Sequence, residues 1–187
     1  MEAIVPAFLL AVLTQLGDRP ALLTAILADR YGRPLLVALG SGLAHAAGNA
    51  LAAAFGMAMT PILTPNAKAL LLAVALILAG FGGLWRMKLP SRLERWRLGA
   101  LLTPMLGIFV LALGDRTQFF TLALAARGEP WFAAAGAAIG AFAVAFIAAV
   151  LGELTWRGLP LVRLRIASAL IFLIAGAWIG LAALRLI

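Results

Sequence analysis

The tetrapeptide Leu16-Gly17-Asp18-Arg19 occurs a second time, as Leu113-Gly114-Asp115-Arg116. Each copy places a carboxylate and a guanidinium inside a stretch that is otherwise almost entirely apolar. A charged side chain at the centre of a bilayer costs about 2.5–3.5 kcal/mol on insertion scales, so ionisable residues inside membrane spans mark candidate functional sites. Two such sites at corresponding places favour a functional role over the alternative, which is a pair of structural ion pairs holding the two halves together.

The composition around these motifs is that of an integral membrane protein. Of the 187 residues, 65% are hydrophobic and the mean hydropathy is +1.09, whereas a soluble domain is only about 45–50% apolar. The net charge of +8 does not indicate a nucleic-acid partner, because the excess Lys and Arg residues lie in short segments between apolar runs. We therefore expect the lipid bilayer as a partner and no nucleic-acid binding. The chain has no cysteine, which excludes disulfides and thiolate metal ligands.

Six apolar runs are long enough to cross a membrane, since a helix needs about 20 residues to span a hydrocarbon core of ~30 Å. We predict an all-α integral membrane protein with six transmembrane helices. The runs cover residues 3–28, 34–59, 67–87, 98–126, 131–154 and 164–186.

Lys and Arg residues are distributed unevenly between the segments that connect these runs. The first, third and fifth connections carry ten of them, whereas the opposite side carries only Lys68, Arg127 and Arg185. Because positively charged loops stay in the cytoplasm, we expect both termini on the non-cytoplasmic side, in a bacterial inner membrane. The ten residues are Arg30, Arg33, Arg86, Lys88, Arg92, Arg95, Arg97, Arg157, Arg163 and Arg165.

The chain also divides into two similar halves. Asp115 follows Asp18 by 97 positions, and Thr121 follows Thr24 by the same offset. Each half holds three spans, an odd number, so the second half must be inverted in the membrane relative to the first. Inverted repeats are a common plan of transporters, with the binding site near the midplane at the repeat interface. We predict one membrane domain made of repeats 1–90 and 91–187, with the two aspartates at similar depth.

The motif also predicts a break in the helix that carries it. Gly17 is a weak helix former, and Pro20 lacks an N–H and disfavours helical geometry at the residue before it. Backbone groups freed in this way are tolerated in a membrane where protein or a water-filled cavity receives them. The second copy has Gly114 but Thr117 in place of the proline, so the break is less strongly indicated there.

At these residues the chain resembles the small cation/proton exchanger family that includes the Golgi manganese/calcium transporters and bacterial manganese exporters. The signature of that family is Glu-x-Gly-Asp-(Lys/Arg)-(Thr/Ser), once in each inverted half. The copies here read Gln15-Leu16-Gly17-Asp18-Arg19-Pro20 and Ala112-Leu113-Gly114-Asp115-Arg116-Thr117. The resemblance implies a metal site built from the acids of both copies, without a resident cofactor, and transport of Mn²⁺ or Ca²⁺ against protons.

The departures from this signature change the expected charge of the site. The leading glutamates of the motif are Gln15 and Ala112 in this chain, so only Asp18 and Asp115 carry over as metal ligands. Each copy then sums to zero charge, with Arg19 and Arg116 expected to tune the carboxylate beside them. Hard oxygen ligands of high negative charge suit divalent cations, so we expect weaker or altered cation binding.

Further polar residues lie near the motifs and are candidates for the same cavity. Gln15 can still offer a carbonyl oxygen to an ion, and Gln118 and Thr121 lie about one helical turn beyond Asp115, with Thr24 as the counterpart of Thr121. Threonines in membrane spans more often bond the backbone of their own helix, which is the alternative for both of them.

His45 is the one histidine and lies in the second apolar run, with Ser41 and Asn49 on the same helical face. It is a candidate proton carrier facing the cavity. The alternative, which we favour for His45 alone, is a polar stripe that binds helices together.

Three functions fit these features. The first is a secondary transporter, most simply a divalent cation/proton exchanger or a relative with an altered substrate. The second is a non-transporting membrane subunit or scaffold that kept the fold after losing both motif glutamates, either as a homodimer or with a partner subunit. The third, an intramembrane aspartyl protease, is disfavoured, because its two aspartates must share one proton and each aspartate here adjoins an arginine that favours the ionised form.

Overall fold

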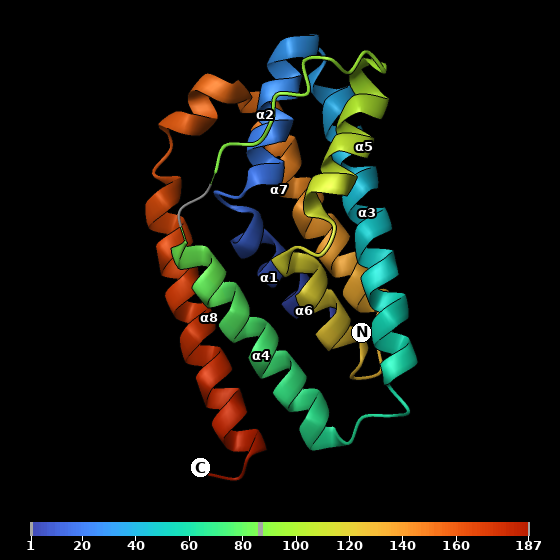
Figure 1. Ribbon diagram of the computed structural model, residues 1–187, viewed down its shortest axis with the longest axis vertical. Helices are drawn as coiled ribbons and strands as arrows, with labels where there is room; N and C mark the ends of the chain where they lie inside the picture. The colour runs from blue at the N-terminus through green and yellow to red at the C-terminus, as the bar shows by residue number, and fades with distance from the viewer. Residues whose placement is uncertain (1, 86–87, 187) are drawn as a thin grey trace.

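The computed structural model describes residues 2–85 and 88–186 (Figure 1). Arg86 and Met87, which the sequence places in a basic connection and at the end of the third span, lie outside the described residues. The described part of the chain is helical, without a strand. Its helices are α1 (Ile4–Gln15), α2 (Arg19–Tyr31), α3 (Pro34–Met59), α4 (Pro65–Leu84), α5 (Gly99–Ala112), α6 (Arg116–Ala125), α7 (Pro130–Gly158) and α8 (Leu161–Ala183).

The helices fit a membrane protein. The helices α3, α4, α7 and α8 are each long and apolar enough to span a bilayer alone. The pairs α1–α2 and α5–α6 pass the same criterion together, although they bend by 68° and 72° at their junctions. There are thus six candidate spans if each bent pair counts as one. The all-α membrane fold is confirmed, but the first and fourth predicted spans are each two helices and not one.

Both bends occur at the repeated tetrapeptide. Gly17 and Gly114 have φ values of +77° and +75°, a left-handed conformation that glycine adopts far more readily than other residues. The next residue then caps the following helix: Asp18 Oδ1 accepts from the Arg19 N–H at 2.8 Å, and Asp115 Oδ1 accepts from the Gln118 N–H at 2.9 Å. The break therefore forms in both copies, and in the second copy it forms without a proline.

The two halves of the chain pack against each other more than within themselves. Helix α3 packs on α5 and α6, α7 packs on α1 and α2, and α4 packs along α8 (Figure 1). Glycines allow two corresponding close approaches, because a Cβ at Gly40 would lie 2.3 Å from the Leu101 carbonyl oxygen and a Cβ at Gly136 would lie 2.3 Å from that of Ile4. These paired contacts are compatible with inverted repeats.

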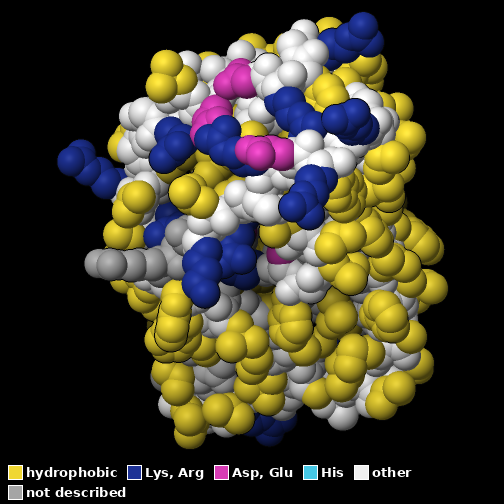
Figure 2. Space-filling model, turned by 45° about the horizontal axis from the view of Figure 1, so that its top comes forward, with side chains coloured by type: hydrophobic (Ala, Val, Ile, Leu, Met, Phe, Trp, Pro, Cys, Tyr) yellow, Lys and Arg dark blue, Asp and Glu magenta, His cyan; other side chains and the backbone are white. Residues whose placement is uncertain are grey.

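The charged side chains gather at one end of the bundle. Both termini lie toward the opposite end, whereas the connections α2–α3, α4–α5 and α7–α8 share the charged end (Figure 1). Seen obliquely from that end, basic and acidic side chains cover the surface and hydrophobic side chains cover the flanks (Figure 2). This pattern matches the expected separation of a basic face from the face that bears the termini.

Helix α7 is kinked near this charged end. Gly152 has φ +72° and ψ 174°, a conformation essentially restricted to glycine. Asp29, in the last turn of α2, accepts a hydrogen bond from the Glu153 N–H at 2.7 Å and so caps the segment after the kink. The side chain of Glu153 pairs with Arg92 at 2.7 Å and Arg157 at 3.2 Å. The kink fixes the direction of the last turns of α7, which carry Trp156.

Candidate functional site

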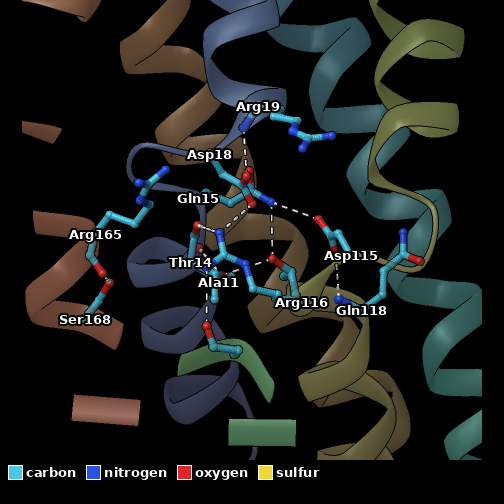
Figure 3. A network of polar contacts seen from close by, with 12 residues as sticks. Ala11, Thr14, Gln15, Asp18, Arg19, Asp115, Arg116, Gln118, Arg165 and Ser168 are labelled. Carbon is cyan, nitrogen blue, oxygen red and sulfur yellow. Dashed lines mark hydrogen bonds and ion pairs between the residues drawn. The ribbon is translucent and has the colours of Figure 1, made fainter. Parts of the chain in front are cut away.

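The two bends face one another, and the two motif aspartates line one cavity. The cavity has a volume of about 350 Å³, and its charged lining residues are Asp18, Arg19, Asp115, Arg116 and Arg165. Figure 3 shows Asp18 and Asp115 on opposite sides of this polar cluster, at the beginnings of α2 and α6. The space-filling view shows a recessed acidic side chain beside a group of basic ones (Figure 2). Two aspartates that lie 97 positions apart in the sequence therefore line the same space.

Arg116 does not pair with its neighbour in the motif. Its Nη2 donates to Asp18 Oδ2 at 2.8 Å, so the ion pair joins the second half of the chain to the first (Figure 3). Arg116 is expected to tune the carboxylate beside it, but its direct ion pair is with the aspartate of the other motif, because the bend turns its side chain across the interface. Gly82 and Gly83 leave room for it: a Cβ at either position would lie 3.2 Å from its side chain.

Arg19 has a different environment from its counterpart in the second motif. Its guanidinium makes no hydrogen bond or ion pair with any residue in the described ranges, and it points away from the Asp18 carboxylate (Figure 3). The two copies of the motif are therefore alike in backbone and unlike in electrostatics.

Gln15 occupies the place that the resemblance assigns to a metal-binding glutamate. It is 1% exposed, and its Nε2 lies 3.3 Å from Asp115 Oδ2 and 3.2 Å from Thr117 Oγ1. The amide thus reaches across to the aspartate of the other half. Each of the four carboxylate oxygens of Asp18 and Asp115 accepts a hydrogen bond. The two Oδ1 atoms accept from backbone N–H groups at the starts of α2 and α6, Asp18 Oδ2 accepts from Arg116, and Asp115 Oδ2 accepts from Gln15. A cation that binds here shares these oxygens with their donors or displaces Arg116 or Gln15 from them.

Gln118, Thr24 and Thr121 lie beside this cavity but are not among its lining residues. The Oε1 of Gln118 accepts from the Gly114 N–H at 2.8 Å and so fastens the second bend. Thr24 donates to the Pro20 carbonyl at 2.9 Å, and Thr121 donates to the Thr117 carbonyl at 3.0 Å. These contacts are the backbone bonds named above as the alternative for the threonines.

The polar stripe of α3 meets the two half-helices that begin at the motifs. The Thr121 hydroxyl also lies 2.7 Å from Asn49 Oδ1, so its one proton is shared between that oxygen and the Thr117 carbonyl. The hydroxyls of Thr24 and Ser41 lie 3.0 Å apart. His45 is 3% exposed and does not line the cavity. These positions correspond to the helix-binding alternative for the stripe.

Sequence reasoning placed Arg165 in a connection and missed it as a site residue. It lies in the first turns of α8 and lines the cavity beside Asp18. The signal available was its position at the start of the last apolar run, where a long side chain can reach inward. With Arg165 included, the lining holds three arginines and two aspartates, so it carries a charge of +1 when all five are ionised.

The described residues contain no cluster of three or more His, Cys, Asp and Glu side chains that could hold a metal ion. The cavity thus offers two carboxylates, which come from different halves of the chain. Hydroxyl groups add neutral oxygens nearby, since those of Thr14 and Thr117 share a hydrogen bond at 3.0 Å beside Gln15.

Comparisons with known proteins agree with this geometry. A protein of Vibrio cholerae serotype O1 named "Putative manganese exporter" is 28% identical over 170 residues, which cover 87% of this chain and 82% of the relative. No solved structure matches the chain. The family model described as "Divalent cation/proton antiporter GDT1" matches residues 3–91 and 100–186, nearly the whole sequence and both motifs. The chain therefore belongs to the GDT1 family of divalent cation/proton antiporters.

Proposed function

We propose that this protein exchanges Mn²⁺ or Ca²⁺ for protons, with Asp18 and Asp115 as the ion-binding carboxylates. The observation that carries the proposal is that one cavity is lined by both aspartates, each contributed by a different half of the chain. A site at such an interface can open to either side of the membrane in turn when the halves 1–90 and 91–187 rock against each other.

The contacts of the carboxylates suggest how an ion and protons exchange. In the present arrangement Asp18 is neutralised by Arg116, and Asp115 accepts from Gln15. An incoming cation takes over the Oδ2 atoms that face these two donors, and the backbone caps on the Oδ1 atoms hold both carboxylates in place. When the cation leaves, a proton neutralises Asp115, and the Arg116 guanidinium returns to Asp18. Arg116 thus stands in for the cation at Asp18 in the empty site.

The substitutions Asp18→Asn and Asp115→Asn are each expected to abolish Mn²⁺ uptake into proteoliposomes, because an amide replaces a carboxylate ligand and cannot carry the exchanged proton. Uptake is measured with a Mn²⁺-quenched dye inside the vesicles under an imposed pH gradient. The control is Glu94→Gln, which neutralises an exposed acid outside the cavity. Uptake that persists in both aspartate variants contradicts the proposal.

The second candidate function is a non-transporting membrane subunit. The observation in its favour is that all four carboxylate oxygens already have donors while the cavity lining carries a charge of +1. On this hypothesis the ion pair between Arg116 and Asp18 holds the fold together. Vesicles that contain the wild-type protein would then take up no Mn²⁺. A partner protein would co-purify with the chain in a constant molar ratio.

We also propose that the charged end of the bundle faces the cytoplasm of a bacterial cell and that both termini lie outside it. The absence of native cysteine makes this directly testable, because Ser91→Cys at the charged end and Asn66→Cys at the other end each introduce the one thiol of the chain. A membrane-impermeant thiol reagent applied to intact spheroplasts is expected to label Asn66→Cys and not Ser91→Cys. The reverse pattern contradicts the orientation.

A further inference from the structure

A second, smaller cavity lies on the other side of Asp18, between α2, the end of α7 and the beginning of α8. Its volume is about 160 Å³. Most of its wall is apolar, and its polar lining residues are Asp18, Trp156, Arg157 and Arg165. The kink at Gly152 directs the last turns of α7 over this space, and Leu161 of α8 closes it against Gly17.

Two residues that line this cavity carry buried donors with no acceptor among the described residues. Trp156 is 1% exposed, and within the described structure its Nε1 has no hydrogen-bond partner. The Nε of Arg165 is also buried and has no hydrogen-bond partner within the described structure. Indole and guanidinium nitrogens only donate hydrogen bonds, and a buried donor without a partner is rare enough to indicate a bound water or ion. Both residues line the same cavity, and an acceptor bound in it is the simplest partner for both donors.

The charges around the cavity indicate that this acceptor is an anion. The carboxylate of Asp18 is already paired with Arg116, which lies outside this cavity, and Arg157 is paired with Glu153. The guanidinium of Arg165 has no acidic partner among the described residues. Water would satisfy the hydrogen bonds of the two donors but would leave this charge uncompensated.

The walls and the location indicate that the anion is attached to an apolar chain. Leu89 is 67% exposed and Val162 is 62% exposed, and both line the cavity, which therefore opens through a hydrophobic rim. The cavity also adjoins the end of the bundle where basic side chains gather (Figure 2). Basic pockets between membrane helices at such an end suit lipid headgroups.

We propose that this cavity binds the phosphate group of an anionic phospholipid, with the phosphate oxygens accepting from Trp156 Nε1 and Arg165 Nε. Arg157 lies at the rim, and an acyl chain runs along Leu89 and Val162. No covalent step is involved.

The bound phosphate also acts on the cavity that holds the two aspartates. Arg165 lines both spaces, so a phosphate that compensates its charge lowers the net charge around Asp18 and Asp115 from +1 to zero. This consequence rests on the proposed cation transport, whereas lipid binding itself does not. Anionic lipid is accordingly a positive regulator of cation binding at the aspartates.

The test is native mass spectrometry of the full chain in detergent, with added phosphatidylglycerol. We expect the wild-type protein to retain one lipid, and Trp156→Phe and Arg165→Gln each to weaken its binding at least tenfold. Phenylalanine keeps an aromatic ring and removes the donor. The matched controls are Trp178→Phe and Arg163→Gln, which change exposed residues of α8 outside the cavity and are expected to bind like wild type.

Two further arms identify the source of the phosphate. Diacylglycerol, which has the same chains without phosphate, is expected not to bind at this site. Millimolar inorganic phosphate is expected not to displace the lipid, and displacement would overturn the lipid in favour of a free anion. Equal lipid retention by the cavity variants and the controls overturns the site itself. Since none of these measurements uses transport, an absence of Mn²⁺ uptake leaves their result unaffected.

Discussion

The substitution Gln15→Glu is expected to raise the affinity of the protein for Mn²⁺ by about 100-fold. The Gln15 amide nitrogen lies 3.3 Å from Asp115 Oδ2, so the substitution replaces a donor to that oxygen with a second carboxylate. Two unit charges about 4 Å apart interact by roughly 4 kcal/mol at an effective dielectric constant near 20, and each 1.4 kcal/mol is tenfold in affinity. Part of this gain is lost in desolvating the ion and the new carboxylate, which leaves about two orders of magnitude.

Isothermal titration calorimetry of purified protein with Mn²⁺ measures the change. Adding Ala112→Glu to Gln15→Glu restores the second motif glutamate and is expected to increase the affinity further. The control is Gln118→Glu, the same chemical change at a residue whose Oε1 is turned to the Gly114 N–H and which does not line the cavity. If Gln118→Glu gains as much affinity as Gln15→Glu, the gain reflects general charge and not the geometry of the site.

Breaking the ion pair between Arg116 and Asp18 is expected to destabilise the protein by about 2–3 kcal/mol in either single variant, Arg116→Gln or Asp18→Asn. Removing one partner of a fully buried ion pair typically costs about 3–5 kcal/mol of stability. The side chains of Arg116 and Asp18 are 19% and 20% exposed, so we expect a loss at the lower limit of this range or slightly below it. The double variant removes both charges of this pair, so it should cost less than the sum of the single variants. Thermal unfolding in detergent measures this coupling, with roughly 2–4 °C expected per kcal/mol.

The same cycle with Arg19→Gln in place of Arg116→Gln is the control. Arg19 lies next to Asp18 in sequence, yet its guanidinium makes no ion pair in the described structure, so its effects should add to those of Asp18→Asn. Additive effects of Arg116→Gln and Asp18→Asn would show that the pair across the interface contributes nothing to stability. A large coupling in a protein that transports no Mn²⁺ would favour the structural role of the pair.

Much of the fold follows from the sequence, because the membrane reduces the choices. Apolar runs of about 20 residues predict spans, and Gly17 together with Pro20 predicts a bend within the first run. The second motif lacks a proline, and its bend forms because Gly114 adopts a positive φ while Asp115 caps α6. Local conformation at one glycine and one cap decides it, and both are visible in the sequence.

The site was predicted less completely than the fold. The repeated motif identified Asp18 and Asp115, but the partner of Arg116 depends on how a bend directs a long side chain across an interface. Arg165 lies 50 residues from the second motif, and no spacing rule connects the start of α8 with the beginning of α2. Such contacts arise from the packing of distant helices, for which a single sequence carries no local signal.

The packing of the two halves against each other constrains the order in which the protein can fold during its synthesis. Each of the buried hydrophobic clusters draws its side chains from both halves: from α3 and α6 in one, α3 and α5 in another, and α2 and α7 in the third. The helices of the first half therefore leave the ribosome and enter the bilayer before the surfaces that cover their small residues exist. The hydrophobic clusters that these helices share with the second half can form only after α7 has been inserted. The fold is therefore completed late in synthesis, when nearly the whole chain is in the membrane.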